Sequence, residues 1–162
     1  MRVSIEKTEP DDVQAIAFLE KQCFSMPLTE EQIRSLIAME NTCFLTAKRN
    51  RNDCGNLEIV GYIGMQTVLD EGYIINIAVS ESCRHQGIAD ALMNCIEEES
   101  LRKYLSFVTL EVRESNDAAI SLYKKHGYHE TGRRFHYYNR PKEDALIFTK
   151  CLPERNRTED SK

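Results

Sequence analysis

The 162-residue sequence has no long apolar run, no excess of basic residues, and little glycine (7) or proline (4). No uncharged apolar stretch approaches the roughly 20 residues that cross a bilayer, so we expect no membrane contact. The composition also excludes collagen-like, mucin-like and intrinsically disordered chains. The hydrophobic fraction of 41% and the charged fraction of 29% are instead typical of a globular protein, and at this length one domain is the default.

The cysteines also lack the spacing of a metal site. None of the six falls in a C-x-x-C pair, and no Cys/His cluster has zinc-ligand spacing, so we expect reduced thiols and no metal. The first dozen residues, MRVSIEKTEPDD, are too charged for a signal peptide, which predicts a cytoplasmic protein. The net charge of −5 argues against a nucleic-acid partner and suits a basic peptide partner.

Hydrophobic periodicity predicts one domain over residues 1–152, followed by a polar, mobile tail over residues 153–162. The segment YIINIAV at 73–79 is nearly continuous in apolar residues, which predicts a doubly buried strand at the centre of a sheet. The element order predicts the α+β class (mixed α/β layers), with about four helices on both faces of a mainly antiparallel sheet of about seven strands. The predicted strands are 3–7, 42–47, 58–68, 73–79, 107–112, 128–138 and 145–151, and the predicted helices are 13–23, 29–39, 87–104 and 115–125.

The stretch INIAVSESCRHQGIAD, residues 75–90, places a tight loop between a buried strand and a helix. Gly87 lets the backbone approach a ligand, and the first N–H groups of the helix favour a phosphate or another anion. The spacing is neither a Walker A loop nor a dinucleotide-binding fingerprint. Taken alone, a glycine at such a junction is more often only a tight turn.

The wider context gives this loop more weight. Arg84-x-x-Gly87-x-Ala89 resembles the Q/R-x-x-G-x-G/A pyrophosphate loop of the GCN5-related N-acetyltransferase (GNAT) superfamily. The later stretches LEVRESN (110–116) and AISLYKKHGY (119–128) are similar to the second half of that fold. The resemblance covers residues 5–152 and is greatest to bacterial N-acetyltransferases of a ribosomal-protein alanine. The stretches that resemble this subgroup are CFSMP (23–27), NIAV (76–79), RRFHYY (133–138) and EDA (143–145).

The resemblance implies acetyl-CoA as co-substrate, bound where a splayed central sheet separates the strand at 73–79 from the one at 107–112. It implies that the pantetheine arm pairs with the backbone of Ile77, Ala78 and Val79. Asn116 is expected to meet the cofactor, a role compatible with capping the helix that follows. The residues implied for the pyrophosphate loop are Arg84, His85, Gln86, Gly87, Ile88, Ala89 and Asp90.

Glu111 is the candidate general base, because a carboxylate in an otherwise apolar strand needs a reason. A protonated amine cannot attack a thioester, and a glutamate removes that proton directly or through one water. The alternative is an outward-facing residue paired with Arg113 or a lysine.

Tyr123 is the candidate general acid, since a phenol of ordinary pKa near 10 can protonate a departing thiolate. The alternative is core packing, because Tyr123 lies three positions after Ile120 on the helix face toward the sheet. A backbone N–H would stabilise the oxyanion, and transfer would be direct within a ternary complex.

Three further features carry alternatives. Cys83 lies beside the loop and is a rival nucleophile, although no triad-like pattern accompanies it. His126 and His129 flank Gly127 at a helix end, where capping or surface roles are commoner than metal binding. The pair at 124–125, both lysines, is expected to be solvated or to meet the 3′-phosphate of the cofactor.

Two departures from the subgroup affect ligand binding. His85 and Asp90 stand where its members often have arginines, which predicts weaker phosphate binding. Leu28 stands where tryptophan is common, in a loop expected to wall the peptide site. A hairpin near 137–144 is expected to form the opposite wall, where Glu143 and Asp144 suit the basic N-terminal segment of a ribosomal protein.

The leading hypothesis is an acetyltransferase for the N-terminal α-amine of a small-subunit ribosomal protein. The second is an acetyltransferase for a lysine side chain or a small-molecule amine. The third is a catalytically idle acyl-CoA-binding module, against which the presence of both Glu111 and Tyr123 argues.

Overall fold

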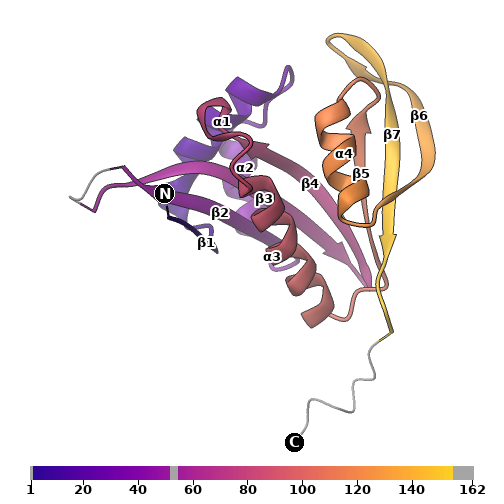
Figure 1. Ribbon diagram of the computed structural model, residues 1–162, viewed down its shortest axis with the longest axis horizontal. Coiled ribbons are helices and arrows are strands. Elements are labelled where there is room, and N and C mark those ends of the chain that lie inside the picture. Colours follow the sequence, from indigo (N-terminus) through magenta and orange to yellow (C-terminus); the bar gives the residue numbers. More distant parts are fainter. Residues whose placement is uncertain (1, 52–54, 155–162) are drawn as a thin grey trace, which may run out of the picture.

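A seven-stranded sheet with helices on both faces organises the computed structural model, which describes residues 2–51 and 55–154 (Figure 1). The strand order is β1-β2-β3-β4-β5-β7-β6, and every neighbouring pair is antiparallel except β4 and β5. The predicted class, sheet and helices are therefore confirmed. The strands are β1 (Val3–Lys7), β2 (Thr42–Asn50), β3 (Leu57–Val68), β4 (Glu71–Val79), β5 (Phe107–Arg113), β6 (His129–Asn139) and β7 (Lys142–Cys151); the helices are α1 (Val13–Cys23), α2 (Glu30–Ile37), α3 (Ile88–Arg102) and α4 (Asp117–Lys125), with 3-10 turns η1 (Pro10–Asp12) and η2 (Glu81–Cys83).

The core lies in two layers, one on each face of the sheet. Successive residues of β3 point to opposite faces, so Tyr62 packs with α1 and α2 whereas Ile63 packs with α3. Helix α4 lies over the β5–β7 half, and its Tyr123 joins the same cluster as α3 (Figure 1). Among the described residues, no helix has the length and apolarity that crossing a membrane requires.

The β4–β5 junction is the point at which the sheet opens. These two strands pair only over Glu71–Tyr73 and Phe107–Thr109 and then diverge. The cause lies in β4, where Gly64 of β3 opposes Asn76 but the next residue opposes Ile74, so that Ile75 is an extra residue. Such a bulge bends its strand and ends regular pairing. The predicted splay in the middle of the sheet is thus confirmed.

Two predictions about individual strands need correction. Strand β4 is not buried on both faces throughout, because β5 diverges and leaves residues 75–77 partly exposed. Strand β2 extends to Asn50, three residues past its predicted end, although its last residues are polar. Lys48 is buried there because its ammonium pairs with Asp12 (3.2 Å) and Glu6 (3.5 Å).

The β6–β7 hairpin contains a second irregularity. Arg134 opposes Ala145 and Tyr138 opposes Glu143, so residues 135–137 bulge outward opposite Asp144. His136 has a positive φ of 53°, and its N–H donates to Asp144 Oδ1 (2.8 Å). Residues 153–154 have no regular structure, and the rest of the predicted tail lies outside the described residues, as does Cys54.

Candidate active site

The divergence of β4 and β5 leaves two adjoining cavities beside α4. The larger, of about 650 Å³, is lined by β4, the loop before α3 and the first residues of α3 and α4. The smaller, of about 220 Å³, is lined by β4, β5, the segment after α1 and Tyr138. Residues 23–24, Ile77, Asn116 and Ala119 line both cavities, which therefore lie next to one another.

The larger cavity gathers all the predicted cofactor residues except Gln86, whose side-chain amide donates to the Ser82 carbonyl (3.3 Å). At its centre Gly87 is the N-cap of α3 with φ of 78°, and the space that a Cβ would occupy is open. The residues that line it as predicted are Ile77, Ala78, Val79, Arg84, His85, Gly87, Ile88, Ala89, Asp90 and Asn116.

The cavity fits a ligand that carries a pyrophosphate and an extended arm. The first N–H groups of α3 have no intrahelical acceptor, and a helix N-terminus favours an anion. Beyond Tyr73, no strand among the described residues pairs with β4 on the side that faces β5, which leaves backbone groups available to an extended ligand. Both properties match the expectation for acetyl-CoA.

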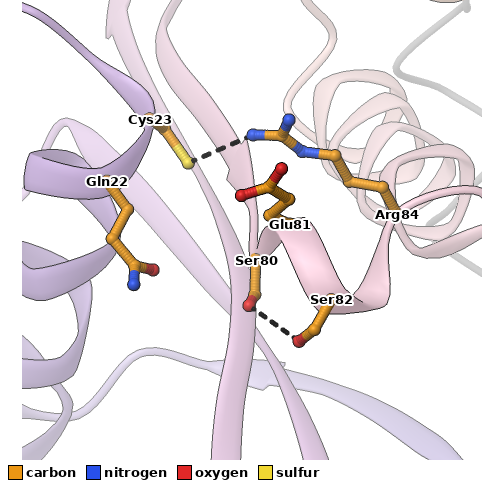
Figure 2. A pocket seen from close by; sticks show the side chains of 6 residues that line it. All are labelled: Gln22, Cys23, Ser80, Glu81, Ser82 and Arg84. Carbon is orange, nitrogen blue, oxygen red and sulfur yellow. Dashed lines mark hydrogen bonds between the residues drawn. The ribbon is translucent and has the colours of Figure 1, made fainter.

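The Arg84 side chain points away from the loop and toward the end of α1 (Figure 2). Its Nε donates to the Val79 carbonyl (3.3 Å), and its Nη2 lies 3.8 Å from Cys23 Sγ. It borders a polar pocket of about 530 Å³ that lies between α1 and η2. The guanidinium is thus turned toward Val79 and Cys23 rather than toward the first turn of α3.

The Asp90 side chain joins the start of α3 to the end of α4. Its Oδ1 accepts a hydrogen bond from Lys125 Nζ (2.8 Å) and lies 3.0 Å from His126 Nε2, and these two contacts lower its pKa. His126 Nδ1 faces Glu97 (3.2 Å), so both ring nitrogens contact carboxylates. Among the described residues, no group of three side chains converges as metal ligands.

Asn116 caps α4, since its Oδ1 accepts from the Ala119 N–H (3.1 Å). It lines both cavities, and its amide nitrogen remains available to a ligand, so the two predicted roles are geometrically compatible. Cys83 is fully buried, which gives no support to the alternative of a cysteine nucleophile.

Glu111 faces the smaller cavity, with a side chain only 10% exposed. Its Oε2 accepts a hydrogen bond from the Tyr73 hydroxyl, and its Oε1 accepts one from Arg134 Nε (2.8 Å). The partner is therefore neither Arg113 nor a lysine. The Arg134 side chain is 56% exposed and can leave the carboxylate without disturbing the core.

Tyr123 reaches the same cavity from α4 and also packs in the core, against the rings of Tyr128 and Phe148. Burial raises the pKa of its hydroxyl, so the group is protonated at neutral pH. Within residues 2–51 and 55–154, no hydrogen bond to this hydroxyl is formed.

Tyr138 lies in the hairpin that was expected to wall the smaller cavity, whereas Asn76 and the Glu20 behind it were missed by sequence reasoning. Tyr138 lines this cavity from the hairpin, and burial raises its pKa to about 12. Asn76 lines it from β4 and donates through Nδ2 to Glu20 Oε1 (2.9 Å). Glu20 is fully buried and also accepts from the Tyr62 hydroxyl and the Leu28 N–H (2.8 Å). The available signal was its position four residues after Ile16, on the inward face of α1.

The loop that contains Leu28 lines the smaller cavity through residues 24–26, but Leu28 itself packs into the core beside α1 and α2. The expectation about Glu143 and Asp144 needs correction. Glu143 accepts from the Ser115 N–H (2.5 Å) and Arg113 Nη1 (3.2 Å), and Asp144 accepts from the His136 N–H and from Arg133. These contacts lower the pKa of both carboxyls and use their charges within the protein, so recognition of a basic segment by this pair is not supported.

Residues 13–128 match the family model described as the acetyltransferase (GNAT) family. The chain belongs to this family, and it is therefore an N-acetyltransferase with a fold that uses acetyl-CoA. It is 30% identical over 146 residues to the ribosomal protein bS18 alanine N-acetyltransferase of Escherichia coli, covering 89% of this chain and 94% of that protein.

Two solved structures show the same architecture. The ribosomal-protein-S18-alanine N-acetyltransferase of Escherichia coli gives a TM-score of 0.85 at 28% identity and covers 97% of this chain and 98% of that one. Arabidopsis thaliana NAA60 in complex with acetyl-CoA shares the fold, with a TM-score of 0.84, 21% identity, and 93% and 99% coverage. The resemblance on which the sequence analysis relied is thus confirmed.

Proposed function

We propose that this enzyme acetylates the α-amine at the N-terminus of a protein, namely the N-terminal alanine of a small-subunit ribosomal protein. The observation that carries the chemistry is the smaller cavity, which Glu111 and Tyr123 both line and which lies next to the cavity of the predicted pyrophosphate loop. The choice of acceptor is supported by the near full-length similarity to an enzyme named for that reaction.

The Glu111 carboxylate would accept a proton from the incoming ammonium group, directly or through one water. The incoming cation would take the place beside Oε1 that Arg134 holds, and the exposed guanidinium would move aside. This step leaves a neutral amine with a free lone pair inside the cavity.

Acetyl-CoA supplies the acetyl group as an activated thioester. The amine nitrogen would form a bond to the carbonyl carbon, the carbon–sulfur bond would break, and the sulfur would leave as a thiolate. Tyr123 would donate its proton to that sulfur, since burial keeps its hydroxyl protonated. The nitrogen, positively charged once it is acetylated, would release its second proton to solvent. The proton held by Glu111 would also pass to solvent and the tyrosinate would take one proton back, so the cycle closes with the net release of one proton.

The test is thiol release from acetyl-CoA with a synthetic peptide that copies the ribosomal protein's N-terminus. A matched peptide with a blocked N-terminus and internal lysines runs beside it, and mass spectrometry locates the acetyl group. We expect turnover on the free N-terminus alone. Turnover on the blocked peptide would indicate a lysine acetyltransferase, and silence on both with acetyl-CoA still bound would indicate a small-molecule amine or an idle module.

A further inference from the structure

We propose that Arg113 is a positioning residue that holds together the two walls of the acceptor site and thereby sets which amines enter. The inference rests on the proposed function in one respect, since it takes the smaller cavity as the acceptor site. The first wall is the α1–α2 loop, residues 24–29, and the second is the hairpin end, residues 135–143.

Arg113 is the last residue of β5 and contacts both walls with one guanidinium group. Nη2 donates to Ser25 Oγ in the α1–α2 loop (3.0 Å) and to the Arg140 carbonyl in the hairpin end (3.0 Å). Nη1 donates to the Pro141 carbonyl (2.9 Å) and to Glu143 Oε2 (3.2 Å). One planar group thus joins segments that are more than a hundred residues apart in the chain.

The same guanidinium also fixes a residue that lines the cavity. Its Cζ lies 4.2 Å from the centre of the Tyr138 ring, a cation–π contact. Tyr138 lines the smaller cavity opposite the α1–α2 loop. The position of this ring in the acceptor site therefore depends on Arg113, and a lysine cannot reproduce both the fork of hydrogen bonds and the stacking.

The hairpin end is also held by the Ser115 N–H, which donates to Glu143 Oε1 (2.5 Å), but within the described residues the α1–α2 loop has no second tie of this kind across the gap. Among the described residues, the Ser25–Arg113 hydrogen bond is the single hydrogen bond or ion pair between the α1–α2 loop and the β5–β7 half. The hairpin end has little core of its own, since Phe135 is 73% exposed and Tyr137 is 47% exposed.

Joined walls favour one kind of acceptor. A chain terminus presents its amine at the end of an extended backbone and enters a narrow mouth end-on. An internal lysine requires a groove that is open on both sides, so that the peptide can pass across it. Separating the walls is therefore expected to weaken binding of a free N-terminus and to admit internal lysines.

The first test is hydrogen exchange of the full-length protein, which needs no acceptor. In Arg113→Met, we expect several-fold faster exchange in both the α1–α2 loop and the hairpin end. Arg133→Met is the matched control, because Arg133 ties the hairpin to Glu114 and Asp144 without touching the α1–α2 loop. It should speed exchange in the hairpin alone. Unchanged exchange of the loop in Arg113→Met would overturn the proposal.

The second test is the kinetic preference for a free N-terminus over an internal lysine. Arg113→Met is expected to raise the KM for the N-terminal peptide and to reduce the preference, each by about tenfold. The KM for acetyl-CoA should change less than twofold. Arg133→Met should retain the wild-type preference, and Arg113→Lys should recover only part of it.

Ser25→Ala removes only the bond between the walls and keeps the proposal testable if the arginine variants fail to fold. We expect a smaller loss of preference and faster exchange in the α1–α2 loop alone. A wild-type result in both measurements would overturn the proposal that Arg113 holds the two walls together. If the wild type itself prefers lysine, the proposed function fails. The proposed role of Arg113 is then judged by hydrogen exchange and by the KM for that acceptor.

Discussion

Two carboxylates reach β4 from different elements, and each accepts a hydrogen bond from a tyrosine hydroxyl. Glu20 of α1 pairs with Tyr62 and contacts only neutral donors, is fully buried and lines neither of the two cavities beside α4. Glu111 of β5 pairs with Tyr73, lines the smaller cavity and has an exposed cation, Arg134, as its second partner.

The difference shows that surroundings decide what such a carboxylate can do. Burial raises the pKa of Glu20 despite its three hydrogen bonds, and its side chain lines neither cavity beside α4. Its contacts with Asn76 and the Leu28 N–H instead fix β4 and the α1–α2 loop. Glu111 has a partner that can leave and a cavity to face, so it can exchange a proton with a ligand.

The largest expected difference between the two carboxylates is the loss of activity on substitution of Glu111. We expect Glu111→Gln to lower kcat/KM for the amine by about 100- to 1,000-fold, because no other carboxylate lines the smaller cavity. The loss should be greatest at low pH, where few amines are already neutral. Acetyl-CoA affinity, measured by calorimetry, should be unchanged, and equal activity across the pH range would remove Glu111 as the base.

The opposite result is expected at Glu20. Glu20→Ala leaves three donors without an acceptor, namely the buried Tyr62 hydroxyl and the partly buried Asn76 amide and Leu28 N–H. The expected loss is about 3 kcal/mol of unfolding free energy, or about 6–12 °C in Tm. Thermal unfolding by circular dichroism measures it, and a Tm within a degree of wild type would contradict the structural role.

The pH dependence of the isosteric variant sharpens this prediction. Burial raises the pKa of Glu20 above its ordinary value of 4.5, so the folded protein holds this proton to higher pH than the unfolded chain does. The stability that Glu20 contributes is therefore fully present below pH 4.5 and declines as pH rises through the folded-state pKa. The difference in unfolding free energy between wild type and Glu20→Gln should therefore shrink as pH rises, as urea titrations at several pH values would show.

Substitution of Tyr123 separates the contribution of its hydroxyl to activity from its contribution to stability. Tyr123→Phe removes no hydrogen bond formed within the described residues, so Tm should change by no more than about 2–4 °C. The kcat should fall by about 10- to 100-fold as the proton donor is lost. Unfolding of the variant would instead show that Tyr123 is chiefly structural.

The smallest expected effects come from the two tyrosines that pair with the carboxylates. Tyr62→Phe should cost about 1 kcal/mol of stability and leave kcat within twofold, because its hydroxyl serves only the Glu20 network. Tyr73→Phe should lower kcat/KM by a few-fold with little change in Tm, since it orients a carboxylate at the cavity. Identical profiles for the two variants would show that the two carboxylates do not differ in role.

Local sequence signals predicted the elements well. The apolar run of β4 placed it at the sheet centre, and Thr29, at the predicted start of the second helix, forms a capping box with Gln32 at α2. Glu111, the predicted general base, lines a cavity, and its role as the base stays a prediction; Gly87 has a positive φ of 78° at the start of α3.

What sequence could not supply was the pairing of charges between distant segments. Glu143 and Asp144 suggested an open acidic surface, yet backbone N–H groups and two arginines already engage them. The sequence pattern predicted the inward face of α1 but not why a carboxylate is tolerated there. Glu20 is tolerated because three donors from three different segments bind it. The hairpin bulge at residues 135–137 likewise depends on register with β7, which no local pattern encodes.

The bulge at Ile75 also bears on aggregation. Most proteins leave their unpaired strand edges at the rim of a sheet, where another chain can add to them. Here β4 and β5 diverge after the bulge, which leaves two additional unpaired edges inside the molecule. These edges face one another across the gap beside α4. A neighbouring molecule cannot lie along either edge without entering the cleft, so the opening that admits a ligand is also shielded from sheet-to-sheet association.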